Sequence, residues 1–400
     1  MKVLICGMDG YLGWPLALRL LDQDRFQVLG LDNFSRRSMV GEVGSDSAIP
    51  IVPMEERLAA CREVFGDAPT FYDGDLRDYE FTAQVLEDEE PDAIVHLGEM
   101  PSAPYSMADA SRAYFTQENN VLGTLNLLFA MRDFAPSSHL VKLGTMGEYG
   151  TPNIDIPEGF FEIEYNGRKD SLPFPRQPGS LYHLSKVHDS FNVMFGCKVW
   201  NLRSTDIMQG VVYGTRTDQI ALDARFSTRF DIDAVFGTAI NRFCAQAVIG
   251  HPITPYGRGH QKRGFIALRD SLACMTLALK YPPSHGEYRT FNQFDMVYDI
   301  SYLAEVVATS AAALGLRAGV SAIDNPRIEA EEHYYNPESK KLRSLGFQPE
   351  HELKEETELM LKDLIPQRAR IHSLEKAIDP SILWDPRPGK MASSSAPGES

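Results

Sequence analysis

The sequence predicts an α/β protein in which a doubly wound parallel sheet is followed by a smaller C-terminal α/β domain. Short apolar runs alternate with helical patterns through the first half of the chain, as they do in parallel sheets with helices on both faces. The first run, Lys2–Cys6, leads into the glycine-rich segment Gly7–Gly13, and the second, Phe26–Leu31, ends at Asp32. We therefore expect a ligand to bind beyond the carboxyl ends of these strands.

The composition is that of an ordinary globular protein, with 400 residues, 43% of them hydrophobic and 24% charged. A net charge of −16 argues against a nucleic-acid-binding surface. No apolar run reaches the roughly 20 residues of a membrane span, and the chain opens on a strand, so we expect no leader segment and a cytoplasmic protein. The cysteines form no C-x-x-C pair, and we expect reduced, mostly buried thiols at Cys6, Cys61, Cys197, Cys244 and Cys274.

The segment from Gly7 to Asp32 has the order of a dinucleotide-binding unit: strand, glycine triad, helix, strand and acid. The glycines would allow a tight turn, a close approach to a pyrophosphate and close packing of helix on strand. The helix would offer its free N–H groups to the phosphates. Asp32 would bind the ribose hydroxyls and favours NAD over NADP, although Arg36 and Arg37 lie close.

Three more strands continue the predicted sheet: Thr70–Leu76, Ala93–Gly98 and His139–Gly144. Residues 33–70 are longer than a simple crossover, and we interpret them as an insertion that caps the cleft, with a helix at 54–65. Asp75 and the leucine after it either face an adenine ring or cap the helix that starts at Tyr79.

Two further helices are expected. One has an apolar face of Val121, Leu125, Leu128 and Phe129 and runs to about residue 134. The other, at 353–364, closes the fold, and the Pro/Gly/Ser-rich segment 386–400 is expected to be a disordered tail.

A tyrosine and a lysine four residues apart, Tyr182 and Lys186, would lie one turn apart on one helix face. A neighbouring ammonium favours the phenolate and brings the tyrosine pKa down from near 10 towards the working range of a general acid/base. The pair alone is weak evidence, because an exposed helix shows it by chance. Thr145, at the end of the third of these strands, supplies a hydroxyl that would bind a sugar oxygen beside Tyr182.

The glycine triad, the strand-end threonine and Y-x-x-x-K together resemble the extended short-chain dehydrogenase/reductase family, which has a Rossmann-type sheet. Longer strings resemble the UDP-sulfoquinovose synthase family, which makes the sulfonated sugar nucleotide of sulfolipid head groups. The strings that carry this resemblance are 102–107, 144–156, 182–190, 231–239 and 325–336. The resemblance implies a homodimer and an NAD-binding domain at 1–205, with parts of 232–250 and 285–300. It also implies a mainly UDP-sugar-binding domain at 206–385.

The resemblance implies a reaction on UDP-glucose: oxidation at C4, loss of water from C5–C6, addition of sulfite at C6 and return of the hydride to C4. Thr145, Tyr182 and Lys186 would be catalytic. The acid pair that dehydratases carry after the threonine is replaced here by Met146 and Gly147, so His183 and Glu148 are the candidates for the elimination. His183 is equally interpretable as a packed helix residue, and Glu148 as the cap of a turn.

The resemblance also implies the two sets of binding residues. The residues expected to contact the cofactor are Gly7, Gly10, Tyr11, Leu12, Gly13, Asp32, Asn33, Arg36, Asp75, Leu76, Gly98, Asn119, Tyr182 and Lys186. Those expected to contact the UDP-sugar are Ser102, Thr145, Tyr182, Gln209, Thr238, Asn241, Arg242, Tyr256, Gln261, Arg263 and Arg327. No metal site is expected, since the spacing of Glu329, Glu331, Glu332 and His333 does not favour one.

Two departures from the synthase pattern concern the nucleophile. Met100 and Pro101 stand where the synthases have Gln-Arg, and Met208 stands where they have asparagine. A proline cannot replace an arginine in charge or donor capacity. Three hypotheses therefore stay open: a sulfoquinovose synthase, a related UDP-hexose 4,6-dehydratase or 4-epimerase that uses no sulfite or another nucleophile, and a non-catalytic nucleotide-sugar-binding module.

Overall fold

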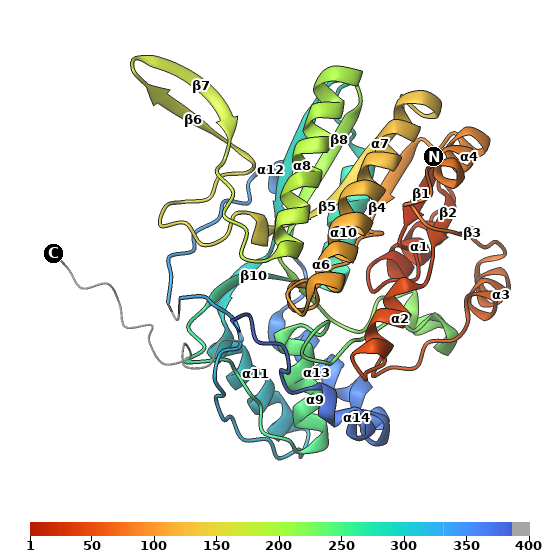
Figure 1. Cartoon of the computed structure of the whole chain (residues 1–400). Coiled ribbons are helices and arrows are strands. Elements are labelled where there is room, and N and C mark those ends of the chain that lie inside the picture. Colours follow the sequence, from red (N-terminus) through yellow and green to blue (C-terminus); the bar gives the residue numbers. More distant parts are fainter. Residues whose placement is uncertain (331, 386–400) are drawn as a thin grey trace.

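A seven-stranded sheet organises the computed structural model, which describes residues 1–330 and 332–385 (Figure 1). Its order is β11-β8-β5-β4-β1-β2-β3, and every neighbouring pair is parallel. The order reverses between β1 and β4, which confirms the predicted doubly wound, Rossmann-type sheet. The strands are β1 (Lys2–Cys6), β2 (Gln27–Asp32), β3 (Thr70–Asp73), β4 (Ala93–His96), β5 (His139–Thr145), β8 (Arg203–Gln209) and β11 (Tyr288–Gln293).

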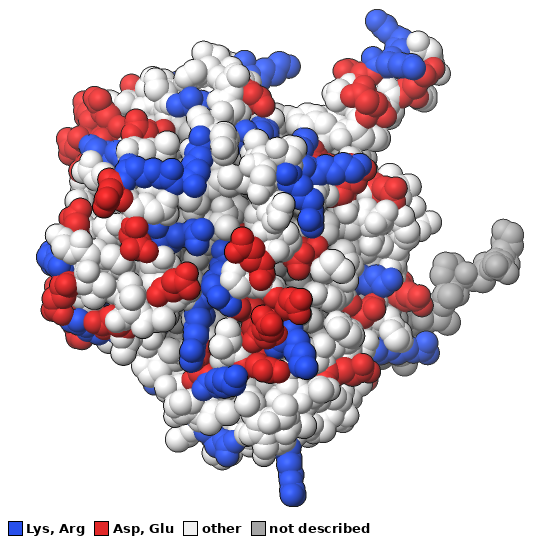
Figure 2. Space-filling model, turned by 180° about the vertical axis from the view of Figure 1, so that it is seen from behind, with Lys and Arg blue, Asp and Glu red and all other residues white. Residues whose placement is uncertain are grey.

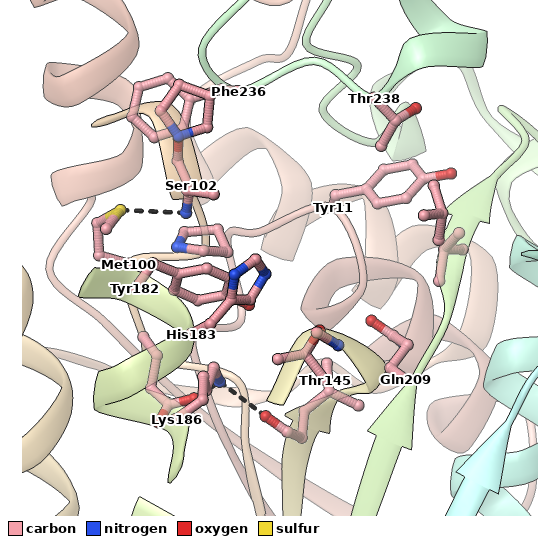
Figure 3. Close-up of a pocket in the computed structure, with 18 of the residues that line it drawn as sticks. Tyr11, Met100, Ser102, Thr145, Tyr182, His183, Lys186, Gln209, Phe236 and Thr238 are labelled. Carbon is pink, nitrogen blue, oxygen red and sulfur yellow. Dashed lines mark hydrogen bonds and ion pairs between the residues drawn. The ribbon is translucent and has the colours of Figure 1, made fainter. Parts of the chain in front are cut away.

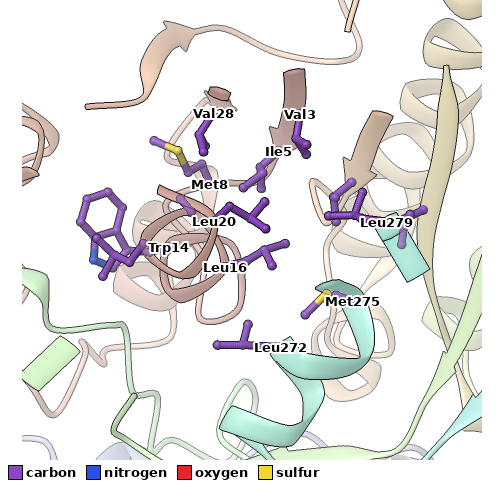
Figure 4. Packing of buried hydrophobic residues seen from close by; sticks show 14 of the residues in the cluster. Val3, Ile5, Met8, Trp14, Leu16, Leu20, Val28, Leu272, Met275 and Leu279 are labelled. Carbon is purple, nitrogen blue, oxygen red and sulfur yellow. The ribbon is translucent and has the colours of Figure 1, made fainter. Parts of the chain in front are cut away.

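Helices cover both faces of this sheet, because side chains of each strand point alternately to the two sides. Val3 and Ile5 of β1 pack with α1 (Gly13–Leu21), α3 (Met54–Phe65) and α10 (Leu268–Lys280), as Figure 4 shows for α1 and α10. Leu4 and Cys6 of the same strand pack on the other side with α4 (Tyr79–Glu89), α7 (Gly123–Phe134) and α8 (Leu181–Trp200). One short apolar strand therefore joins two cores.

A smaller sheet and its helices lie beyond the carboxyl ends of the large sheet. Its strand order is β12-β10-β9, and the elements are β9 (Val211–Tyr213), β10 (Lys262–Ala267), β12 (Met296–Asp299), α9 (Ala239–Ile249), α11 (Ile300–Ala313), α13 (Leu353–Leu364) and α14 (Arg368–Ser373). These helices share one apolar core with β10. Because β8 and β11 belong to the large sheet, the chain passes between the two layers more than once, and the domain division at residue 205 stays a prediction.

Shorter elements complete the chain. They are α2 (Ser35–Glu42), α5 (Ala103–Ser106), α6 (Ala110–Gln117), η1 (Glu118–Leu122), η2 (Met146–Glu148), η3 (Ile220–Leu222), η4 (Ala224–Phe226), α12 (Lys341–Ser344), η5 (Ile365–Gln367) and η6 (Glu375–Ala377). An antiparallel hairpin of β6 (Phe160–Tyr165) and β7 (Arg168–Pro173) projects from the body (Figure 1). Basic and acidic side chains are interspersed on the rear face (Figure 2).

Several sequence predictions can be checked on this fold. The insertion helix at 54–65 and the helix at 353–364 have the predicted bounds, whereas α2 was not predicted. All five cysteines are buried and unpaired, as expected. No helix in the described ranges is long and apolar enough to cross a membrane. The predicted tail at 386–400 lies outside the described residues.

Only part of the apolar face predicted near residue 125 is buried. The buried residues of α7 include Leu127, Leu128 and Met131, whereas Phe129 is 38% exposed. A π-helical turn, η1, also separates α6 from α7. The segment is apolar nearly all round, so its spacing alone could not choose which side faces the core.

Candidate active site

A cavity of about 650 Å³ opens at the carboxyl ends of the parallel strands, between the large sheet and the smaller one (Figure 3). Turns after β1, β2, β4, β5 and β8 form one wall, and residues from α9 and β10 form the other. Every residue predicted for the site lines this cavity except Glu148. The position of the cavity agrees with the rule that ligands bind beyond the carboxyl ends of parallel strands, and its lining residues lie far apart in the chain.

The turn after β1 is a cradle that tolerates no side chain. Gly7 has a φ of +84°, and a Cβ there would lie 2.7 Å from the backbone of Leu97. A Cβ on Gly13 would lie 2.1 Å from the Gly7 carbonyl oxygen. The following helix has no side-chain cap, so its first N–H groups stay available to an anion. Bare backbone beside a helix N-terminus fits the pyrophosphate of a dinucleotide.

Asp32 lies at the end of β2 with its carboxylate in this cradle. It accepts hydrogen bonds from the N–H groups of Asp9 at 2.8 Å and Phe34 at 2.7 Å. Burial, with the nearby Asp9 carboxylate, raises the pKa of Asp32 to about 6. The two arginines that would favour NADP both form ion pairs with aspartates. Arg36 pairs with Asp231 at 2.7 Å, and Arg37 pairs with Asp9 at 2.7 Å.

The contacts of Asp75 exclude one of the two interpretations that the sequence left open for this residue. Its carboxylate accepts from Asn33 at 2.8 Å and pairs with Arg77 at 2.8 Å. The cap of α4 is Asp78, which accepts from the N–H of Phe81. The interpretation of Asp75 as a helix cap is therefore wrong, because the helix starts one turn too late for its carboxylate.

The predicted catalytic residues lie on two adjoining elements. Thr145 ends β5, and its hydroxyl accepts the Gly147 N–H at 3.1 Å. Tyr182 and Lys186 lie in the first turns of α8, which Ser180 caps. The Lys186 ammonium donates to the Leu143 carbonyl at 2.7 Å and forms an ion pair with Glu99. All three predicted residues face the same space in Figure 3.

The predicted lowering of the tyrosine pKa is not observed. Burial raises the pKa of Tyr182 above its ordinary value, and the Thr145 hydroxyl only partly opposes this as a hydrogen-bonding neighbour. Burial also lowers the pKa of Lys186 to about 8. The reason is geometric: the Lys186 ammonium lies 6.0 Å from the centre of the Tyr182 ring and is held by Glu99 instead.

The two candidates for the elimination differ in position. His183 lines the cavity beside Tyr182, with 5.0 Å between the ring centres. Its Nδ1 lies 3.0 Å from the Ser180 hydroxyl, and burial lowers its pKa to about 3, so the ring is neutral near pH 7. Glu148 is fully buried beneath the cavity.

Glu148 belongs to a buried charge network. Its carboxylate accepts the Thr145 N–H at 3.3 Å and the Ser190 hydroxyl at 3.0 Å. It lies 3.8 Å from the ammonium of Lys142 and 3.6 Å from the guanidinium of Arg176. Burial raises the pKa of Glu148 to about 7. This carboxylate supports the strand-end turn and does not reach the cavity.

Cations and unpaired polar atoms gather at the far end of the cavity. Thr238 caps α9, and Arg242 in its first turn donates to the Thr254 carbonyl at 3.1 Å. Arg263 pairs with Glu329 at 2.6 Å. Side chains at this end that hold a buried polar atom without a hydrogen-bond partner include Asn241, Arg242, Gln261 and Arg327. Such atoms fit a polar, anionic ligand better than an empty interior.

The two methionines that depart from the synthase pattern have different environments. Met100 lines the cavity and is 1% exposed, and its sulfur accepts the Ser102 N–H at 3.2 Å. Met208 is fully buried behind Thr145, packed with Met146 and Tyr149. Met208 does not line the cavity, because alternation along β8 turns Gln209 towards it instead.

Sequence reasoning missed some of the lining. No role was predicted for two residues that line the cavity, Glu99 and Trp384. Glu99 has a local signal, because it follows β4 at the carboxyl edge of the sheet. Trp384 has none, since it reaches the cavity through long-range contacts. No cluster of three or more metal-ligating side chains occurs in the described ranges.

The chain belongs to the NAD dependent epimerase/dehydratase family, which it matches over residues 3–292. NAD is accordingly the cofactor that the glycine cradle and Asp32 fit. Within the family, it is 48% identical to the chloroplastic UDP-sulfoquinovose synthase of Spinacia oleracea, over 96% of this chain and 79% of that one. It is 47% identical to the UDP-sulfoquinovose synthase of Sulfolobus acidocaldarius, over 96% and 98%.

Solved structures share the fold at lower identity. A UDP-glucose-4-epimerase from Stenotrophomonas maltophila, with bound NAD, aligns with a TM-score of 0.70 at 18% identity, over 93% of this chain and 99% of that one. A UDP-glucuronic acid 4-epimerase from Bacillus cereus, in complex with UDP-glucuronic acid and NAD, aligns with a TM-score of 0.67 at 19% identity, over 91% and 99%. These likenesses establish the fold alone.

Proposed function

We propose that this protein is an NAD-dependent enzyme of the UDP-sulfoquinovose synthase type, acting on UDP-glucose. The observation that carries the proposal is the 47–48% identity to two synthases over 96% of the chain. The shared cavity of Thr145, Tyr182, Lys186 and the glycine cradle supports it, because a non-catalytic binding module would not need the first three.

The first step is oxidation of the sugar at C4. The hydroxyls of Thr145 and Tyr182 bind O4, and Tyr182 takes the O4 proton. NAD held by the glycine cradle and Asp32 would supply the acceptor for the C4 hydride. Burial opposes ionisation of Tyr182, and the charge of Arg36 and the Thr145 hydroxyl partly offset that cost.

The second step is loss of water from C5–C6, and we assign it to His183. A 4-ketone acidifies the C5 proton, and its removal needs an unprotonated base beside the sugar. The His183 ring is neutral at working pH and lines the cavity, while Glu148 does not line it. His183 takes the C5 proton and passes it to the C6 hydroxyl, which leaves as water. Bisulfite then adds through sulfur to C6, and its proton returns to C5 through His183. Return of the hydride to C4, and of a proton from Tyr182 to O4, completes the turnover.

The cations at the far end hold the UDP diphosphate. Arg242, Arg263 and Arg327 converge there, and the N-terminus of α9 adds its free N–H groups. The unpaired buried atoms of Asn241 and Gln261 gain partners when a nucleotide binds. A polyanionic ligand thereby accounts for a cationic cluster in a protein of net charge −16.

Sulfite is the proposed nucleophile, and one observation favours an alternative. Met100 and Pro101 leave the wall above Lys186 without the arginine of the synthase pattern, so it is less suited to steering an anion. The second candidate is therefore a UDP-hexose 4,6-dehydratase or 4-epimerase that uses no sulfite or a less charged nucleophile. C4 oxidation is common to both.

A product assay separates these candidates. Purified protein is incubated with UDP-glucose, with and without sulfite, and the product masses are recorded. A sulfonated UDP-sugar that needs sulfite supports the synthase. A product that has lost water without gaining sulfite, or an epimer, supports the alternative. No change in any UDP-hexose, despite bound NAD, would leave only a binding module.

We also infer a homodimer formed through α7 and α8. Large apolar side chains are exposed on these neighbouring helices and on η1 before them: Leu122, Phe129, Phe191, Phe195 and Val199 are 38–55% exposed. An apolar patch of this kind marks an association surface.

The cytoplasmic location is likewise a proposal. Five buried, unpaired thiols support a reducing compartment, although the spinach relative is named chloroplastic. Fractionation of cells that make the tagged protein tests it, and enrichment in an organelle would overturn it.

A further inference from the structure

The described part of the chain ends in residues 374–385, the short helical turn η6 and the irregular segment after it, which we call the C-terminal strap. It is anchored at several points. The Ala234 N–H donates to the Ala377 carbonyl at 2.9 Å, and Ile378 is fully buried in the core of the smaller layer. The Trp384 N–H donates to the Pro326 carbonyl at 3.0 Å. These contacts hold the strap against Ala234 and Pro326, beside the cavity.

The strap places an indole in the cavity wall. Trp384 is half-buried and lines the cavity together with Arg327, whose guanidinium carbon lies 5.7 Å from the centre of its ring. A narrow recess beside the main cavity is lined by Trp384, Tyr256 and Val235 among others, and by no residue of the glycine cradle. Trp384 thus lies at the end away from the cofactor, next to the cluster of arginines.

The arginines at this end of the cavity indicate which part of a ligand the Trp384 indole contacts. Arg242 and Arg327 have buried nitrogens that lack partners and suit a diphosphate. The part of a nucleotide that extends beyond its diphosphate is a planar base, which gains most from an aromatic face. Tyr256 is already covered by the guanidinium of Arg242, 4.2 Å from its ring centre, whereas no other ring is recorded against the indole among the described residues.

We propose that Trp384 is the stacking platform for the uracil base of the UDP-sugar, which makes the C-terminal strap part of the nucleotide site. The inference rests on the proposed function only in taking a uridine nucleotide as ligand. Stacking on one aromatic ring accounts for roughly 5- to 150-fold in affinity. The indole would therefore discriminate UDP from ligands that carry a diphosphate without a base.

The test compares UDP with inorganic pyrophosphate on the NAD-loaded, full-length protein by titration calorimetry. Trp384→Ala should weaken UDP by roughly 5- to 150-fold while leaving pyrophosphate within about twofold, and Trp384→Phe should recover most of the UDP affinity. Trp200→Phe, a substitution on α8 outside the cavity, is the matched control and should bind both ligands normally.

Fluorescence gives an independent readout, because the chain has only three tryptophans and Trp14 is fully buried away from the cavity. UDP should quench the wild-type protein and the Trp200→Phe variant but not Trp384→Ala. Equal weakening of UDP and pyrophosphate would overturn the proposal, since the strap would then only support the arginines. Unchanged UDP affinity would also overturn it. Neither result depends on sulfite or turnover, so failure of the proposed reaction is seen separately in the product masses.

Discussion

The substitution Gly147→Ala tests the assignment of His183 without removing any titratable group. Gly147 lies in η2, between Thr145 and Glu148, and lines the cavity. A Cβ at this position would lie 2.3 Å from Nε2 and 2.4 Å from Cδ2 of His183, where an ordinary contact is 3.4–4 Å. The imidazole therefore has to move by about 1 Å, a displacement that costs on the order of 100-fold in a step that depends on its position.

The expected effect is confined to the elimination. Alanine keeps the Gly147 N–H that binds the Thr145 hydroxyl at 3.1 Å, so oxidation at C4 should stay within severalfold of wild type. Samples taken during turnover of UDP-glucose are quenched in hydroxylamine, which traps a 4-ketone as its oxime. The amount of each product is then measured by mass spectrometry. The trapped ketone should accumulate while products that have lost water fall by about 100-fold.

A matched control lies in the same cavity. Gly179 also lines it, but a Cβ there meets nothing within 4 Å, so Gly179→Ala should retain both steps. His183→Phe, which keeps a ring without nitrogen, should reproduce the block. The assignment would be refuted by Gly147→Ala or His183→Phe protein that eliminates water at the wild-type rate, or by equal loss of oxidation and elimination in both.

Three other predictions follow from the same structure. Tyr182→Phe should lower turnover of UDP-glucose by at least about 100-fold while NAD still co-purifies, because it removes the proton carrier and not the cradle; full activity would refute the mechanism. His96 and His139 are buried, and burial lowers the pKa of each to about 3, so the stability they contribute is present above pH 6.5 and is lost as the pH falls. In urea unfolding, the loss of stability between about pH 7 and pH 5.5 should be smaller by about 1.3 kcal/mol in His139→Leu than in wild type; an equal loss in both proteins would contradict the burial of His139. Phe195→Glu, on the exposed apolar face of α8, should give a monomer in size-exclusion chromatography, whereas an unchanged dimer would place the interface elsewhere.

The cofactor half of the site could be predicted because its requirements are local. A glycine with positive φ, a second one that clashes with the first if it carries a Cβ, and an acid at the next strand end all lie within 26 residues, from Gly7 to Asp32. Backbone sterics alone impose these residue types. The strand-end threonine followed from the rule that the carboxyl ends of parallel strands share one edge, whereas the tyrosine on α8 followed from its spacing to Lys186 and from the family resemblance.

Glu148 shows where such local reasoning ends. It directly follows the catalytic turn, which made it a candidate, but η2 folds its carboxylate back onto the Thr145 N–H and into the sheet. There the buried Lys142 and Arg176 offset its charge. The spacing in the sequence predicted proximity to Thr145 correctly and could not give the side of the strand on which the carboxylate lies.

The effect of Lys186 on Tyr182 could not be predicted for a different reason. A spacing of four residues places two side chains on one face, but a long lysine side chain selects its partner from everything within reach. Here Glu99 and the Leu143 carbonyl hold the ammonium, and burial dominates the pKa of the phenol. The carboxylate that decides the outcome lies 87 residues away in the sequence.

Of the residues that depart from the synthase pattern, only those in one wall of the cavity can affect which nucleophile reaches the sugar. Met208 is fully buried and packs behind Thr145, so its difference from the synthase pattern changes the support of the turn and not the surface that a nucleophile meets. Met100 and Pro101 do line the cavity, close to Ser102, and neither can donate a side-chain hydrogen bond to an anion. Restoring the cation with Pro101→Arg should therefore increase sulfite incorporation if the wall limits it, and should change nothing in C4 oxidation. An equal yield of sulfonate in both proteins would mean that sulfite enters by another side of the cavity, and that the departure at Met100 and Pro101 carries no information about the product.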